Sequence, residues 1–361
     1  MSENGAVSTM WTDAELDEAL AALNAEVDAP SEDVRTTLLL ACREAPPKPR
    51  RRFAWVAASA AVAVLTAGVL VMPGAPGATA EAAENLGAAA ARALGNPDAR
   101  PGPGQFSYTA TREWALASAS TTTGKPLSVL QESLVQLWVP SVRAEHWLVR
   151  SGQTGARKWL VGNEDLARAE GDGGLLDPRA NRERVQRGPC GDFPDSNGEL
   201  GGTPDDGKPC GERYGHWEAP APRFLADLPR DPDALYERLH KDAHGRGPDV
   251  LRLASGVLRT AETSAELRAA VYRALVKLPG LDVTDNAANL DGRRGTALGL
   301  TEGDLRDEVI VDTGSGRYIG RRSVLVQPGT GFWAGLPAGT VVEFTAVTVG
   351  VTDRAGVVPT N

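Results

Sequence analysis

The sequence predicts an α+β domain, with helices on one face of a curved antiparallel sheet, joined to a single transmembrane helix. Two observations support this prediction. Strand-like segments are followed by a block of helical segments and then by further strand-like segments, an order typical of α+β domains. One apolar run of twenty residues, 53–72, contains no charge. A helix of that length spans about 30 Å, which is the thickness of the hydrocarbon core of a bilayer.

The charges beside the apolar run predict its orientation. Residues 1–47 contain ten acidic and two basic side chains, and a basic cluster then adjoins the run. This cluster consists of Lys48, Arg50, Arg51 and Arg52. Because no Lys or Arg follows the run before Arg92, the positive-inside rule places the N-terminus in the cytoplasm and the C-terminal bulk outside the cell. We therefore expect a single-pass protein of the cell membrane, in contact with the lipid bilayer.

This topology divides the chain into four expected parts. They are an acidic helical cytoplasmic segment with its basic stop, a transmembrane helix, a juxtamembrane helix with a linker, and an extracytoplasmic α+β domain. Their boundaries are 1–52, 53–72, 73–104 and 105–361. A cleaved signal peptide is the alternative, since Ala78-Thr79-Ala80 has the small residues of a cleavage site. About fifty residues precede the run, which favours an uncleaved signal anchor, and cleavage after Ala80 stays open.

The acidic cytoplasmic segment is expected to form two short helices, over about 13–27 and 32–44. The first begins with a capping box, Thr12-x-x-Glu15, and the prolines at 46, 47 and 49 end the second. Two helices of this size bury little apolar surface on their own. Either the segment is a disordered acidic tail, or residues 13–44 fold against a cytoplasmic partner.

The extracytoplasmic part is expected to begin with an alanine-rich helix over about 80–94 and to continue with strands. The strand-like runs are rich in Val, Leu, Trp, Tyr and Thr. They cover 105–115, 129–139, 145–150 and, more weakly, 158–161. Residues 162–222 are dense in Gly, Pro and Asp and are expected to form a long irregular excursion.

A helical block and a second set of strands follow. Asp231-Pro232 is a strong helix start, and Thr263-x-x-Glu266 is a capping box. The predicted helices cover about 231–242, 249–261 and 263–277. The predicted strands cover 281–284, 295–300, 308–312, 318–327 and 341–351. The sequence Thr-Gly-Ser-Gly at 313–316 predicts a turn between the third and fourth of these strands.

The cysteines are consistent with the predicted topology. Cys42 lies alone on the cytoplasmic side, whereas Cys190 and Cys210 lie in the extracytoplasmic part, where an oxidising compartment favours a disulfide. Closing that loop would stabilise the fold by roughly 3 kcal/mol in the chain-entropy model. A metal site is the weaker alternative, because only two thiols and one nearby imidazole, His216, are present.

Tryptophans are concentrated in the first set of strands. These tryptophans are Trp114, Trp138, Trp147 and Trp159. Core packing explains them most simply. The sharper hypothesis is an aromatic-lined concave sheet that holds an apolar or lipid-like ligand.

Other motifs give little support for catalysis. Asp312-Thr313-Gly314-Ser315 matches the aspartic-protease signature, but the motif occurs once and also fits an ordinary hairpin turn. His240 and His244 have zinc-like spacing, but they fall at a helix end, where cationic side chains are favoured. We therefore expect no catalytic residue, cofactor or metal. The net charge of −9 argues against a nucleic-acid partner.

The order of these features resembles an uncharacterised, locus-tag-named family of actinobacterial single-pass membrane proteins. The resemblance spans nearly the whole chain. Its segments are 228–235, 265–275 with 278–280, 292–295, 313–320, 336–340 and 351–356. It implies this architecture but no activity, because none is established for the family.

The same plan resembles that of membrane-bound anti-sigma factors, although the His-x3-Cys-x2-Cys motif of one such group is absent. We therefore expect a non-enzymatic envelope sensor or regulator, with a sigma-factor-like partner at residues 13–44. The alternatives are an extracytoplasmic carrier of lipid or another hydrophobic ligand and, with least support, a membrane-tethered aspartic-type hydrolase.

Overall fold

The computed structural model describes residues 77–96, 98–177, 182–191, 193, 212 and 214–359. No helix within these ranges is long and apolar enough to cross a membrane. The predicted transmembrane helix at 53–72, the basic cluster from Lys48 to Arg52 and residues 13–44 lie outside them, so the predicted topology stays a prediction.

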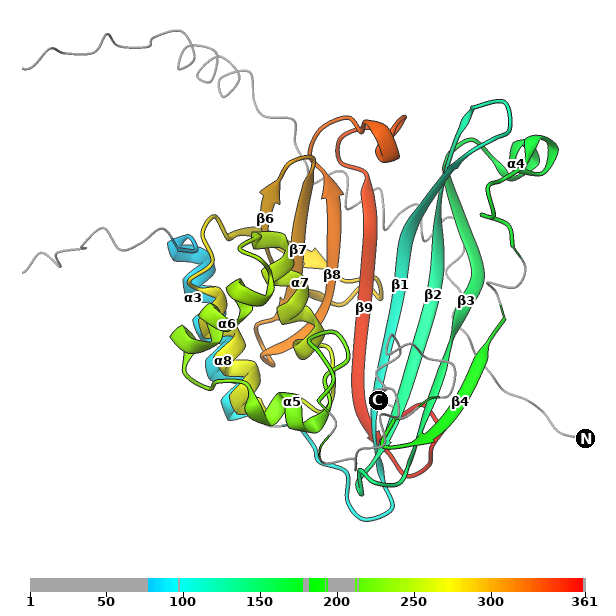
Figure 1. Cartoon of the computed structure of the whole chain (residues 1–361). Coiled ribbons are helices and arrows are strands. Elements are labelled where there is room, and N and C mark those ends of the chain that lie inside the picture. Colours follow the sequence, from blue (N-terminus) through cyan, green and yellow to red (C-terminus); the bar gives the residue numbers. More distant parts are fainter. Residues whose placement is uncertain are drawn as a thin grey trace, which may run out of the picture. The chain divides into compact units, whose positions relative to one another are not determined.

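The described part of the chain contains one open antiparallel sheet with the strand order β4-β3-β2-β1-β9-β8-β7-β6-β5 (Figure 1). The strands are β1 (Phe106–Ser120), β2 (Pro126–Pro140), β3 (His146–Val161), β4 (Arg184–Pro189), β5 (Asp282–Ala288), β6 (Arg294–Glu302), β7 (Leu305–Asp312), β8 (Arg317–Leu325) and β9 (Val341–Thr352). The helices are α3 (Ala80–Gly95), α4 (Glu164–Glu170), α5 (Pro222–Asp227), α6 (Pro232–Asp242), α7 (Gly247–Leu258) and α8 (Ala265–Leu275), and a 3-10 turn, η2, covers Gly331–Trp333. The predicted α+β class and antiparallel sheet are confirmed.

The main core lies between the helices and one face of the sheet, which we call the helical face. Leu298, Val309 and Val347 project from β6, β7 and β9 on this face. They contact apolar side chains of the helices, such as Val257 and Leu275. Burial of apolar surface on this scale is the principal stabilising contribution to such a fold.

Helix α3 belongs to this core. Ala82, Leu86 and Ala90 are fully buried in it, and α3 packs against α8. The sequence predicts this helix as part of a juxtamembrane segment at 73–104, whereas in the structure it packs into the folded domain. Its alanines allow this, because small side chains let two helices approach closely.

The helix starts follow from their capping residues. Thr79 and Asp231 cap α3 and α6 with their side-chain oxygens. For α8 the predicted cap, Thr263, is wrong. Its neighbour Ser264 accepts the hydrogen bond from the amide of Leu267 at 3.2 Å, while the hydroxyl of Thr263 donates to the carbonyl of Val257 at 2.5 Å.

The first strands are longer and more continuous than predicted. Strands β1 and β2 pair over their whole length, and the predicted strands 145–150 and 158–161 are the two ends of a single strand, β3. A bulge in the β2–β3 ladder between Gln131 and Ser133 shifts the register inside this strand. The residues between the two predicted strands are Gly and polar side chains, so the sequence does not indicate that the strand continues through them.

The excursion at 162–222 contains regular structure that the sequence does not predict. Helix α4 and the edge strand β4 lie within it, and α5 begins at its end. Strand β4 reads Arg-Val-Gln-Arg-Gly-Pro, which lacks the apolar alternation of a half-buried strand. Cys190 directly follows β4 and is disulfide-bonded, and its predicted partner, Cys210, lies outside the described residues.

Strands β8 and β9 pair only over residues 322–324 of β8, and they separate on the N-terminal side of Arg322. The turn that follows β5 fills this gap. Asn289 donates from Nδ2 to the carbonyl of Ile319 on β8 at 2.7 Å, and the amide of Leu290 donates to the carbonyl of Thr345 on β9 at 3.3 Å. These two bonds bridge the gap, and the direct pairing of residues 322–324 with 341–344 joins the two strands at their other end.

Candidate functional site

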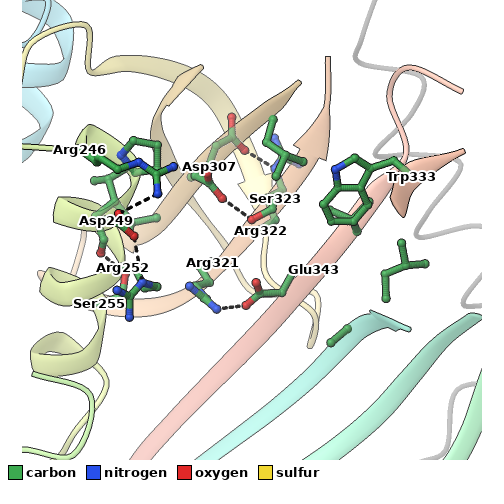
Figure 2. Close-up of a pocket in the computed structure, with 18 residues that line it drawn as sticks. Arg246, Asp249, Arg252, Ser255, Asp307, Arg321, Arg322, Ser323, Trp333 and Glu343 are labelled. Atoms are coloured by element: carbon green, nitrogen blue, oxygen red, sulfur yellow. Dashed lines mark hydrogen bonds and ion pairs between the residues drawn. The ribbon is translucent and has the colours of Figure 1, made fainter. Parts of the chain in front are cut away.

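A cavity of about 330 Å³ lies between α7 and the helical face of the sheet (Figure 2). Strands β7, β8 and β9, with Ala115 and Leu116 of β1, form its floor. Charged side chains from both walls line it, with Trp333 and Leu116 at one side. Its volume is at the lower end of the range for small-molecule sites.

The helical wall presents a charged stripe. Arg246, Asp249 and Arg252 recur at intervals of three residues and therefore lie on one side of α7. Asp249 forms ion pairs with Arg246 at 3.3 Å and with Arg252 at 3.4 Å. The opposite side of α7, with Val250 and Ala254, is buried in the core, so the apolar periodicity of the helix fixes the stripe toward the cavity.

The sheet wall holds an ion pair between neighbouring strands. Arg321 on β8 pairs with Glu343 on β9, and both side chains are mostly buried (Figure 2). Next to this pair, the hydroxyl of Ser323 donates to the carboxylate of Asp307 on β7. The two walls therefore present basic and acidic groups to the same cavity.

Glu343 is an unusual carboxyl group. Burial raises its pKa to about 7, since the rise caused by burial exceeds the opposing attraction of Arg321. Glu113 on β1, which lies diagonally across the β1–β9 ladder, adds to the rise and shares a hydrogen bond with Glu343. A proton is therefore held near neutral pH in the wall of the cavity.

A second cavity of about 120 Å³ lies beside the first on the helical face. Glu113 lines the second cavity and Glu343 lines the first, so this carboxyl pair stands between them. Arg259 and Trp147 also line the smaller cavity. Glu218 and Glu262 line it too, so the smaller cavity has three acidic groups and one basic group.

The opposite face of the sheet holds a different charged group. Glu308, whose side chain is only 1% exposed, forms ion pairs with Arg306 at 2.7 Å and with Arg322. Burial alone raises the pKa of Glu308, but these arginines and a hydrogen bond from Thr284 outweigh it and lower the pKa. Because its partners come from the same sheet, we interpret this group as structural.

The four predicted ligand-facing tryptophans do not share a surface. Trp114 and Trp138 lie on the opposite face, as their pairing with Phe344 and Tyr108 shows. Trp147 and Trp159 lie on the helical face. All four contribute to separate packing sites, and of these only Trp147 lines a cavity described here.

Other motifs singled out in the sequence have local roles. The carboxylate of Asp312 accepts hydrogen bonds from the amide of Gly314 at 2.9 Å and from the hydroxyl of Ser315 at 2.7 Å, which makes it the cap of the predicted hairpin turn. His240 packs against Tyr236 in the last turn of α6, whereas His244 lies beyond the end of that helix. Within the described ranges, no cluster of three or more His, Cys, Asp or Glu side chains is arranged to hold a metal ion.

Comparisons with protein-family models, with curated proteins and with solved structures found no match. The resemblance to the actinobacterial membrane-protein family therefore stays a prediction, and the site has to be interpreted from its own chemistry.

Sequence reasoning missed the residues of the larger cavity. Glu343 is the only charged residue of β9, which is the one signal in the sequence, whereas Glu113 and Arg321 lie in strands that hold other charged residues. More than two hundred positions separate Glu113 from Arg321 in the chain. Only the strand order β1-β9-β8 brings them together.

Proposed function

We propose that this protein is a non-enzymatic, membrane-anchored envelope sensor whose extracytoplasmic domain binds a small polar ligand in the cavity beside α7. The observation that carries the proposal is that charged groups of both signs line the two facing walls of this cavity. Arg246 and Arg252 on the helix face Asp307, Arg321 and Glu343 on the strands. A ligand that carries both donors and acceptors can replace water at both walls.

The lining favours a polar ligand over a lipid. An acyl chain in this cavity would remove water from Arg321, Glu343 and Asp307 without replacing its hydrogen bonds, which costs several kcal/mol. A zwitterionic molecule or a sugar offers those hydrogen bonds. The carrier hypothesis has less support, since the predicted aromatic residues are divided between the two faces of the sheet.

The regulatory output is assigned to the cytoplasmic segment. Helix α7 forms one wall of the cavity and the sheet forms the other. A ligand that contacts both walls would favour a conformation in which they lie closer together. The predicted transmembrane helix at 53–72 connects the domain to residues 13–44, the proposed site for a sigma-factor-like protein. The hydrolase alternative has least support, because the carboxylate of Asp312 is committed to its turn.

The test compares transcription in cells that carry the native chain, a chain lacking residues 1–47, or the cavity variants Arg252→Gln and Asp307→Asn. If the proposal is right, deleting 1–47 changes a set of transcripts, and the cavity variants change the same set. Arg168→Gln is the matched control, because Arg168 is an exposed arginine on α4, outside the cavity lining. The sensor proposal fails if removal of residues 1–47 leaves transcription unaltered.

A further inference from the structure

The loop between β8 and β9 exposes an aromatic pair. Phe332 is 55% exposed, and its ring packs edge-on against Trp333 with the ring centres 4.7 Å apart. Val326, on the same loop, is 43% exposed. The chain has no charged residue between Arg322 and Glu343, so this whole loop is uncharged. Exposed apolar surface without charge is typical of contact surfaces.

The aromatic pair is held in place by its own loop. The amide of Gly329 donates to the carbonyl of Leu336 at 2.9 Å, and the amide of Trp333 donates to the carbonyl of Thr330 at 3.0 Å. The side chain of Trp333 packs on a small core beneath the loop. That core contains Leu325, Leu336 and Val342. The loop therefore presents Phe332 outward on a fixed support.

This loop lies at the end of the sheet where the described chain begins. The amide of Thr79 donates to the carbonyl of Leu281 just before β5, which places the start of α3 at that end. The amide of Val326 donates to the carbonyl of Asp304 in the neighbouring β6–β7 turn. Figure 1 shows the start of α3 and the β8–β9 loop at the upper end of the domain.

The length of the chain limits how far this end can lie from the membrane. Four residues, 73–76, separate the predicted transmembrane helix from Gly77. Fully extended, they reach about 18 Å at most. We propose that Phe332, supported from below by Trp333, inserts into the interfacial region of the outer leaflet and orients the domain on the bilayer. Aromatic side chains are enriched at this depth of membranes. The inference rests on the membrane anchor of the proposed function.

The test is photo-crosslinking from the full chain in native membranes. The photoreactive residue p-benzoylphenylalanine replaces Phe332 in one variant and Val142 in the matched control. Val142 is also 55% exposed, but it lies between β2 and β3, at the other end of the sheet. We expect phospholipid adducts at position 332 at a yield at least ten times that at position 142. Equal yields at both positions, or adducts to protein in place of lipid at 332, would overturn the inference.

Alkaline carbonate extraction of the same membranes separates two causes of failure. If carbonate releases the chain, the membrane anchor is wrong and this inference is overturned with it. If the chain resists carbonate and position 332 yields no lipid adduct, the contact of the loop is overturned while the anchor stands.

Discussion

Glu343 on β9 and Arg321 on β8 form an ion pair in the wall of the larger cavity, and burial keeps the pKa of this carboxyl group near 7 in spite of the arginine. The pair is therefore not a simple stabilising contact. Above neutral pH it is a buried charge pair with a substantial desolvation cost, and below neutral pH Arg321 faces a neutral acid. Because Glu343 can be charged or neutral near pH 7, the site is sensitive to pH and to the charge of a ligand.

The first prediction concerns pH and stability. The pKa of Glu343 rises from its ordinary value of 4.5 to about 7 on folding, so the folded state binds this proton more tightly than the unfolded state. Its contribution to the free energy of unfolding is therefore full below pH 4.5 and is lost as pH rises through 7, by on the order of 3 kcal/mol. Denaturant unfolding of the purified full chain at pH 5 and pH 8 measures this.

Glu343→Gln should flatten that dependence, because the amide cannot ionise. Glu164→Gln on the exposed face of α4 should leave it unchanged. Parallel pH profiles for the native chain and Glu343→Gln would contradict the assignment of the proton to this carboxyl.

The second prediction concerns the partner of Glu343. Arg321→Gln leaves the carboxylate without a counter-ion, so the variant should lose about 2 kcal/mol at pH 8 and clearly less at pH 5, where the carboxyl is protonated. Combining it with Glu343→Gln in a double-mutant cycle should give a coupling energy of at least about 1 kcal/mol at pH 8.

The matched control for this cycle is Arg168→Gln with Glu164→Gln, an exposed ion pair on α4. That pair should couple by less than about 0.5 kcal/mol. If the buried and exposed pairs couple equally, the desolvation argument for the cavity is wrong.

Some elements of this fold are specified by a few neighbouring residues. Asp231 caps the start of α6, and four consecutive residues after Val311 form the turn that begins at Asp312. Both features were predicted from the sequence and are confirmed. Strand β4 was missed because an edge strand of six residues needs no apolar stripe. Hydrogen bonding to β3, and not its own residue pattern, holds β4 in an extended conformation.

The candidate site could not be predicted in the same way. Whether Trp138 and Trp147 share a face depends on the register set by the turn between β2 and β3, which is not readable from apolar spacing. The contact of Glu113 with Glu343 depends on the first and last strands of the domain's sequence lying side by side. Such contacts depend on the order of the strands in the sheet, which local composition does not predict.

The third prediction concerns the gap between β8 and β9. Asn289 is buried, and its Oδ1 atom accepts hydrogen bonds from the amides of Asp291 at 3.1 Å and Arg293 at 2.9 Å while Nδ2 donates to Ile319. Asn289→Ala leaves three backbone groups unsatisfied, so we expect a loss of about 2–3 kcal/mol in the free energy of unfolding. Urea denaturation checks this.

Asn85→Ala is the control, since Asn85 donates an exposed hydrogen bond to the carbonyl of Glu81 within α3 and accepts only one long hydrogen bond, of 3.4 Å, from Thr296 on β6. It should change stability by less than about 0.5 kcal/mol. Hydrogen exchange should also be faster at the amides of β8 and β9 in Asn289→Ala alone. Unchanged protection there would show that the two strands hold together without this side chain.

The last prediction uses two glycines with opposite surroundings. A methyl group added to Gly299 on β6 would lie 2.5 Å from the carbonyl oxygen of Asp307 and from the Cγ atom of Glu308. Gly299→Ala should therefore push β7 and its buried carboxylate aside and cost at least about 2 kcal/mol. Gly87 lies in α3 with nothing within 4 Å of the added methyl group, so Gly87→Ala should stabilise the domain by up to about 1 kcal/mol. Thermal unfolding of both variants measures the two effects, and an unchanged or raised melting temperature in Gly299→Ala would mean that the packing of β6 against β7 is looser than the structure shows.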